Sequence, residues 1–209
     1  MNNMIVFNEE NQAIQYLKLT DDRIRYLIDR IGCYNFILRS NYFEALVNSI
    51  VGQQLSAIVA RVIRGRLLIL CNTIEPQSIL NCSDEALREI GVSKAKIAYI
   101  KNLSSCVLNK QIDLQYVAQL SDREVIAELT KLKGIGHWTA EMFLIFSLGR
   151  LNVLSSNDIG LHRAIKWLYN LEEYPSPIIM KKYGEIWSPY CTVASLYLWE
   201  VINQNLIAE

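Results

Sequence analysis

Apolar residues recur every three or four positions along much of this chain, and that spacing predicts helices. From Phe43 they fall at 46, 47, 50 and 51, and after an expected turn at 52–56 they continue at 58, 59, 62, 63 and 67. An apolar stripe of this period indicates a helix with one buried face. Because residues 35–39 form the only weak strand candidate, we predict an all-α fold of about ten helices.

Residues that favour helix starts precede several of these segments. Ser121 with Glu124 predicts a capping box. Ser188 followed by Pro189 predicts the start of a last helix that runs toward Trp199. Further start signals stand at Thr20 to Asp22, Ser83 and Ser93.

Composition narrows the class of protein. With 51% hydrophobic and 20% charged residues, the chain of 209 residues is typical of a globular protein with a sizeable core. The apolar runs are too short to cross a bilayer, and residues 1–12 lack a secretory pattern, so we expect an intracellular address. The five cysteines form no Cys-x-x-Cys pair, which argues against a disulfide framework, a zinc site and an iron–sulfur cluster.

The formal net charge of zero is unusual for a nucleic-acid-binding domain, but the charges are unevenly distributed. Residues 30–74 hold five arginines and a single acid, Glu44, while residues 90–112 hold four lysines and no acid. On charge alone, these stretches are best interpreted as solvated helix faces.

The segment 129–140, Leu-Thr-Lys-Leu-Lys-Gly-Ile-Gly-His-Trp-Thr-Ala, is the most informative in the chain. It predicts a helix that ends near Lys133, a tight turn framed by Gly134 and Gly136, and a second helix that starts near Trp138. Amides at such a helix N-terminus suit a phosphate oxygen. Gly-x-Gly alone would favour an ordinary connection between two helices.

The longer pattern resembles the hairpin of the helix-hairpin-helix DNA glycosylases, in particular the 3-methyladenine DNA glycosylase II group. Segments 43–56, 91–100 and 187–199 resemble that family in the same order. The resemblance implies two helical lobes, residues 1–41 with 151–209 and residues 42–150, with the hairpin at 129–149 and an interlobe active-site cleft. Larger bacterial members carry a β-rich N-terminal domain, for which this chain is too short, so we expect the compact form.

The resemblance places Asp158 at the family's catalytic carboxylate. An ionised carboxylate stabilises the oxocarbenium character of a sugar during glycosidic cleavage, and it can also activate water. An aspartate at this position could also simply cap a helix, which contributes ~1 kcal/mol of stability. The hairpin upstream favours the catalytic role, and the two roles are compatible. Ser155 and Ser156 depart from the family, in which a proline is common there.

Trp138 stands where relatives that also cut the strand carry a lysine. Tryptophan cannot form a Schiff base, so the expected product is an abasic site in an intact strand. The resemblance further implies a base pocket lined by Trp138, Trp199, Phe43 and Met142, with Phe43 equally suited to the core. Alkylated purines are electron-poor and stack well on aromatic rings.

A flipped base leaves a gap in the duplex, which the resemblance fills with a wedge from Gln53, Gln54 or Leu55. Core packing for Leu55 and a polar surface for the glutamines are equally compatible with the sequence. Phosphate contacts are expected from Gly134, Gly136, His137 and Thr139. His162 could neighbour the active site or lie on the surface.

Together these features predict a monofunctional DNA N-glycosylase that acts as a monomer on double-stranded DNA, without an organic cofactor, and excises alkylated purines of the 3-methyladenine and 7-methylguanine type. The alternatives are a glycosylase for another lesion and a non-enzymatic helix-hairpin-helix module that only holds DNA. Family hairpins often hold Na+ or K+ through main-chain carbonyls, here those of Leu129, Leu132 and Ile135.

Overall fold

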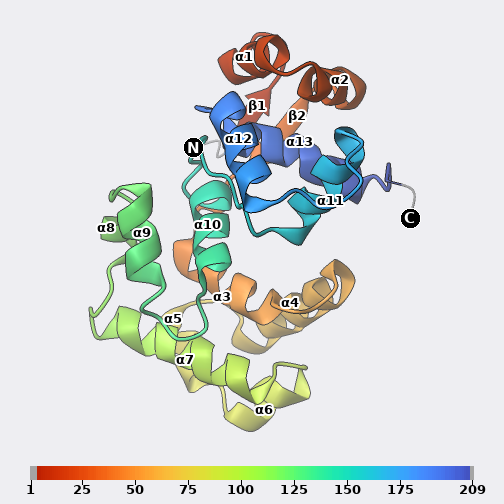
Figure 1. Cartoon of the computed structure of the whole chain (residues 1–209). Coiled ribbons are helices and arrows are strands. Elements are labelled where there is room, and N and C mark those ends of the chain that lie inside the picture. Colours follow the sequence, from red (N-terminus) through yellow and green to blue (C-terminus); the bar gives the residue numbers. More distant parts are fainter. Residues whose placement is uncertain (1–3, 208–209) are drawn as a thin grey trace. The chain divides into compact units, whose positions relative to one another are not determined.

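The computed structural model describes residues 4–207, which form thirteen helices and one two-stranded sheet (Figure 1). This content confirms the predicted helical fold class. The chain divides into two compact units: residues 1–38 with 149–209, called unit 1 here, and residues 39–148, called unit 2. Within the described residues, no helix is both long and apolar enough to cross a membrane.

Unit 1 is built from an N-terminal and a C-terminal segment of the chain. Its elements are β1 (Met4–Phe7), α1 (Gln12–Thr20), α2 (Asp22–Ile31), β2 (Tyr34–Ile37), α11 (Ile159–Leu168), α12 (Pro177–Trp187) and α13 (Cys191–Asn203).

The small sheet of unit 1 is antiparallel and pairs Met4 with Ile37 and Phe7 with Tyr34. Only its second strand overlaps a segment with a weak strand signal in the sequence. A strand of four residues offers too few alternating positions to be recognised without its partner, which lies beyond α1 and α2.

Helix α13 forms the centre of unit 1 and packs against α2 and α11. Every residue from Cys191 to Leu198 is buried. A second anchor is the buried carboxylate of Asp21, which caps α2 and accepts hydrogen bonds from the Tyr169 hydroxyl and, at 2.9 Å, from Trp187 Nε1. Because these partners end α11 and α12, one carboxylate fixes the ends of three helices.

The prediction that the last helix starts at Ser188 and Pro189 is wrong. The Ser188 amide donates to the carbonyl of Gly184, so Ser188 ends α12. Helix α13 begins at Cys191, with Tyr190 as its N-terminal cap residue. A serine before a proline can stand at the start of one helix or at the end of the helix before it. Here Ser188 is the C-terminal cap residue of α12.

Unit 2 is entirely helical in its described residues. Its elements are α3 (Tyr42–Gly52), α4 (Ala57–Cys71), α5 (Pro76–Asn81), α6 (Asp84–Glu89), α7 (Lys94–Leu108), α8 (Leu114–Val117), α9 (Asp122–Leu129) and α10 (His137–Phe146). The predicted capping box of Ser121 and Glu124 is confirmed at the start of α9.

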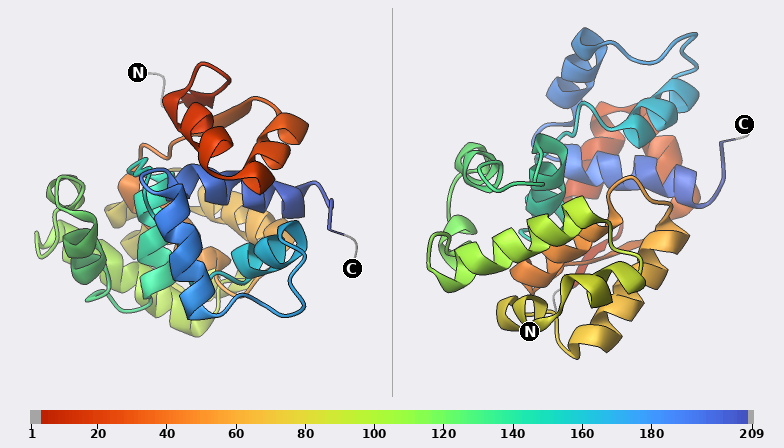
Figure 2. Two further views of the ribbon diagram at one scale, coloured as in Figure 1. Left: turned by 45° about the horizontal axis from the view of Figure 1, so that its top comes forward. Right: turned by 90° about the horizontal axis from the view of Figure 1, so that it is seen from below.

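The core of unit 2 forms where α3 meets α4, α7 and α10; Figure 2 shows α7, in yellow-green, running past α3. Leu46, Ile50 and Ile100 are almost completely buried there, at 1% exposure or less. Each such side chain contributes about 1.5–3 kcal/mol relative to an exposed position. The predicted helix after residue 56 is α4, but Ile58, Val59 and Val62 on it are exposed.

Candidate functional site

The two glycines of the hairpin between α9 and α10 have different structural roles. Gly134 has φ +88, and a Cβ there would lie 2.4 Å from the ring carbons Cγ and Cδ2 of Tyr99 on α7. The fold therefore requires glycine at this position. Gly136, with φ −90, precedes α10, and a Cβ there would meet nothing within 4 Å. The residues around Gly136 therefore leave room for a larger side chain at this position.

Helix α10 begins without a side-chain cap at Gly136. The peptide dipoles of a helix give its N-terminus partial positive charge, which favours an anion. His137 and Trp138 are exposed in this first turn, whereas Thr139 is buried. The imidazole Nδ1 of His137 lies 3.3 Å from Oε1 of Glu141. Of the expected phosphate-binding side chains, the structure thus places His137 at the surface and Thr139 inside.

The turn between α3 and α4 is tied to the hairpin by hydrogen bonds. Gln53 Nε2 donates to the carbonyl of Gly134 at 2.8 Å and to Oγ1 of Thr139 at 3.4 Å. The ammonium of Lys96 donates to the carbonyls of Val51 and Gln53, at 2.9 and 2.7 Å. Partial burial lowers the pKa of Lys96. This lysine therefore stabilises the turn between α3 and α4 through its hydrogen bonds.

The three wedge candidates differ in their surroundings. Gln53 is held inward by the bonds to the hairpin. Gln54 is exposed and has a left-handed backbone, φ 56, while Leu55 is half-buried. Gln54 therefore forms the tip of the turn. Sequence reasoning missed the tie between Gln53 and the hairpin because its two ends lie 81 residues apart.

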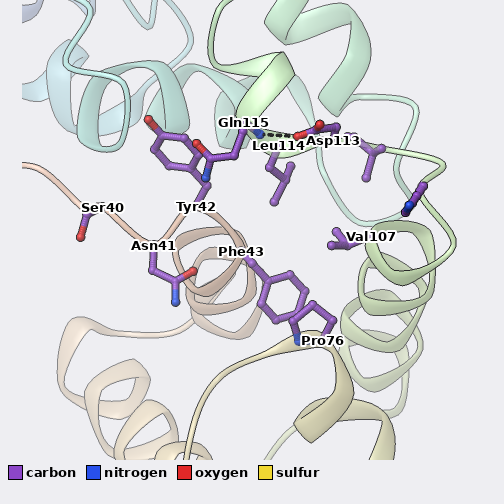
Figure 3. Close-up of a pocket in the computed structure, with 11 residues that line it drawn as sticks. Ser40, Asn41, Tyr42, Phe43, Pro76, Val107, Asp113, Leu114 and Gln115 are labelled. Carbon is purple, nitrogen blue, oxygen red and sulfur yellow. Dashed lines mark hydrogen bonds between the residues drawn. The ribbon is translucent and has the colours of Figure 1, made fainter.

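Three of the expected pocket residues line three different cavities of unit 2. Trp138, 44% exposed, lines an open cavity of about 710 Å³ together with Gln53, Gln54 and hairpin residues 130–136. Phe43 is buried and lines a cavity of about 780 Å³, where its ring lies beside Pro76 (Figure 3). Met142 is buried on α10 and lines a third, much smaller space. The surroundings of Phe43 favour its role in the core.

Asp158 is the N-terminal cap residue of α11 and is 9% exposed. Its Oδ1 accepts a 2.8 Å hydrogen bond from the amide of Leu161 and a 3.0 Å bond from Nε1 of Trp199. The capping role expected from the sequence is present. The structure also places the expected catalytic residue and an expected pocket residue in direct contact, both within unit 1.

Gly160 lies close to Asp158 and Trp199, and the sequence interpretation did not single it out. A Cβ on it would lie 3.0 Å from Oδ1 of Asp158 and 3.5 Å from Cδ1 of Trp199. Glycine in the first turn of a helix disfavours the helix, by about 1 kcal/mol relative to alanine. Its presence beside a cap residue was the available signal that another group approaches closely.

The loop before Asp158 is held from within unit 1. Ser155 is buried and its carbonyl accepts the Asp158 amide at 3.0 Å, so a serine takes part in this turn where the family often has a proline. The ring Nε2 of His162 lies 2.7 Å from the carbonyl of Ser156. His162 therefore supports the loop next to Asp158.

The expected cation ligands lie in the hairpin backbone. The carbonyl of Leu129 accepts the amide of Leu132, and the carbonyl of Leu132 accepts that of Ile135, both at 3.1 Å. A carbonyl oxygen has two lone pairs, so each can accept a second partner. Among residues 4–207, no group of three or more histidine, cysteine, aspartate or glutamate side chains could hold a metal ion.

Comparison with known proteins extends the resemblance across the chain. A family model described as "HhH-GPD superfamily base excision DNA repair protein" matches residues 47–189. DNA-3-methyladenine glycosylase 1 of Schizosaccharomyces pombe is 31% identical over 192 residues, which cover 88% of this chain and 84% of that protein.

Two solved structures match nearly the whole chain. The crystal structure of a DNA-3-methyladenine glycosidase from Bacillus halodurans has a TM-score of 0.84 at 40% identity, covering 97% of this chain and 94% of that one. A 3-methyladenine DNA glycosylase of Schizosaccharomyces pombe in complex with abasic DNA has a TM-score of 0.85 at 28% identity, covering 95% and 100%. The chain belongs to the HhH-GPD superfamily of base excision DNA repair proteins.

Proposed function

We propose that this protein is a monofunctional DNA N-glycosylase that removes alkylated purines, of the 3-methyladenine and 7-methylguanine type, from double-stranded DNA. The observation that carries the proposal is the buried carboxylate of Asp158, one oxygen of which accepts two hydrogen bonds. The chain that places it there belongs to a superfamily of base excision DNA repair proteins. Relatives with the same fold are named for 3-methyladenine, and one was crystallised with abasic DNA.

In the proposed reaction the bond between the purine nitrogen and C1′ breaks, and its electron pair leaves with the base. Positive charge then develops on the sugar, and the ionised carboxylate of Asp158 offsets it. Water supplies the oxygen that bonds to C1′, and its proton goes to Asp158 or to solvent. A cationic alkylated base leaves readily, which fits a site with little provision for a general acid.

The product is an abasic site in an intact strand. Strand cleavage by this fold needs an amine nucleophile, and Trp138 occupies the corresponding position. Nearby Lys131 is paired with Glu128 at 2.6 Å. These features support hydrolysis by water rather than Schiff-base chemistry.

For recognition of the base we propose aromatic stacking on Trp199 and Trp138, because an electron-poor purine is attracted to an indole face. Met142 and Phe43 are buried and line separate spaces of unit 2, so we propose for them a part in the packing of that unit and not a contact with the base. Gln54, at the exposed tip of its turn, and the half-buried Leu55 are the proposed wedge that fills the gap in the stack.

The hairpin would hold the DNA backbone. The amides around Gly134, Gly136 and His137 at the start of α10 suit a phosphate, with Thr139 contributing through its main chain. The carbonyls of Leu129, Leu132 and Ile135 would hold a monovalent cation that also attracts phosphate. We propose that the protein acts as a monomer, inside the cell.

The test is base release from N-methylated duplex DNA by the wild type and by Asp158→Asn, separated by chromatography and run alongside a strand-nicking assay. We expect release of 3-methyladenine or 7-methylguanine without nicking, and loss of most of this release in the variant while DNA binding persists. Binding without release would contradict the proposal in favour of another lesion or a DNA-holding module. Equal release by both proteins would remove Asp158 from the mechanism.

A further inference from the structure

The indole of Trp199 reaches Asp158 from a rigid support. Trp199 follows the fully buried run Cys191–Leu198 on α13 and is itself half-buried, so the helix fixes where its ring emerges from the core. Its Nε1 lies 3.0 Å from Oδ1 of Asp158. These two residues are 41 positions apart in the sequence, and the contact lies within unit 1.

The contact between the indole of Trp199 and the carboxyl group of Asp158 is a hydrogen bond in which the indole is the donor. An indole N–H can only donate, and its bond to an ionised carboxylate is charge-assisted. The same Oδ1 also accepts the amide of Leu161. Two donors from different helices on one oxygen fix the plane of the carboxylate, which a single capping bond leaves free to rotate.

Gly160 provides the space for this arrangement. The hypothetical Cβ at this position lies 3.0 Å from Oδ1 of Asp158 and 3.3 Å from Cδ1 of Ile202. A methyl group there would press on the carboxylate oxygen that receives both hydrogen bonds. The absence of a side chain at Gly160 thus leaves the Asp158 oxygen free to accept the hydrogen bond from the indole.

We infer that Trp199 is a positioning residue for Asp158, acting through its indole N–H in addition to any stacking on the substrate base. The inference rests on the proposed function. The N–H orients the carboxylate toward the developing charge on the sugar, so it contributes to the rate of bond cleavage rather than to DNA affinity.

The matched variant is Trp199→3-benzothienylalanine, in which sulfur replaces the N–H and the ring shape is retained. We expect the single-turnover rate of alkylpurine release at saturating enzyme to fall roughly 10- to 100-fold, the range for losing a bond to a charged group. The Kd for duplex with an abasic site should stay within about twofold, because stacking and phosphate contacts remain. A variant with the wild-type rate would overturn the inference.

Gly160→Ala tests the position of the Asp158 carboxylate without changing the indole donor. Alanine favours helix, so the fold should be retained, whereas displacement of the carboxylate should lower the single-turnover rate about tenfold or more. Retention of the full rate would show that Asp158 tolerates the shift and would count against the positioning role.

A readout independent of activity separates this inference from the proposed function. In ¹⁵N-labelled protein, the indole hydrogen of Trp199 should exchange with solvent faster in Asp158→Ala than in the wild type, and its resonance should move. Unchanged exchange would refute the hydrogen bond even in an active enzyme. If the wild type released no alkylated base, the proposed substrate would fail, while slow exchange would still support the contact between the indole and the carboxylate.

Discussion

The side-chain amide of Gln53 donates a hydrogen bond to the main-chain carbonyl of Gly134, across 2.8 Å. This bond joins the turn after α3 to the hairpin before α10, the two parts of unit 2 to which the proposed function assigns the wedge and the phosphate contact. The turn and the hairpin are therefore mechanically coupled.

Gln53→Ala should lower both stability and affinity. Loss of the bond leaves a hairpin carbonyl without this donor, and we expect the free energy of unfolding to fall by about 1 kcal/mol. Affinity for abasic-site duplex should fall as well, because the hairpin loses its brace. Urea unfolding and fluorescence anisotropy measure the two effects. Gln54→Ala, at the exposed tip, is the matched control and should leave the unfolding free energy unchanged; equal destabilisation by both variants would refute the coupling.

The two hairpin glycines should differ strongly in how well they tolerate alanine. Gly134→Ala would place a methyl group against the ring of Tyr99 and would require alanine to adopt a positive φ. We therefore expect the free energy of unfolding to fall by about 2 kcal/mol or more. Gly136→Ala should cost at most about 1 kcal/mol of stability, because its Cβ meets nothing and alanine is only a poorer N-cap residue than glycine. If DNA approaches Gly136 closely, this second variant will lose affinity without a comparable loss of stability. Thermal unfolding together with titration of duplex DNA distinguishes these outcomes, and a Gly136→Ala variant destabilised as much as Gly134→Ala would contradict the geometry.

The sequence alone predicted what depends on local patterns. The helical spacing from Phe43 to Leu67, the capping box at Ser121 and the Gly-x-Gly hairpin each involve neighbours along the chain. The second helix of the hairpin starts at His137, close to the expected Trp138, but the first helix ends at Leu129 and not near Lys133, because residues 130–133 form turns and a bend. Asp158 was singled out by resemblance, because it follows the hairpin at a family spacing; its capping role is present in the structure, and its catalytic role stays a prediction.

What the sequence could not predict depends on partners that are distant in the chain. The role of Gly160 requires Trp199 to be near, and the role of Gln53 requires Gly134 to be near. The strand at Met4–Phe7 exists only because Tyr34–Ile37 returns beside it. No periodicity within a short window contains this information.

Stability should decline in alkali through the half-buried Tyr169. Burial raises the pKa of the Tyr169 phenol above its ordinary value of 10.0, and the hydrogen bond to Asp21 acts in the same direction. Above pH 10 the unfolded chain releases this proton while the folded protein retains it, so the free energy of unfolding decreases as pH rises. Below pH 9 this residue should add no pH dependence. Denaturant unfolding between pH 8 and 11 measures the slope, and Tyr169→Phe should make it shallower; an identical slope would exclude Tyr169 as its source.

The cysteines should differ sharply in reactivity. Burial raises the pKa of the Cys71 thiol to about 12, with a further contribution from Cys82, and burial raises that of Cys191 to about 11. Cys33 is exposed. Because the thiolate is the reactive form, iodoacetamide at pH 8 should label Cys33 well before Cys71 or Cys191, as followed by peptide mass spectrometry. Early labelling of Cys71 in the folded protein would contradict this order.

The wild type should form no covalent adduct with abasic DNA. An enzyme that cleaves the strand through an amine forms a Schiff base, which borohydride reduces to a stable protein–DNA complex. Trp138 supplies no amine, and the ammonium of Lys131 is paired with Glu128. Incubation with abasic duplex and borohydride should therefore give a single free-protein band on a denaturing gel and leave the strand intact. A bifunctional glycosylase run in parallel is the positive control for trapping. An adduct with the wild type that persisted in Lys131→Ala and Lys133→Ala would place an amine nucleophile elsewhere in the chain and end the monofunctional assignment.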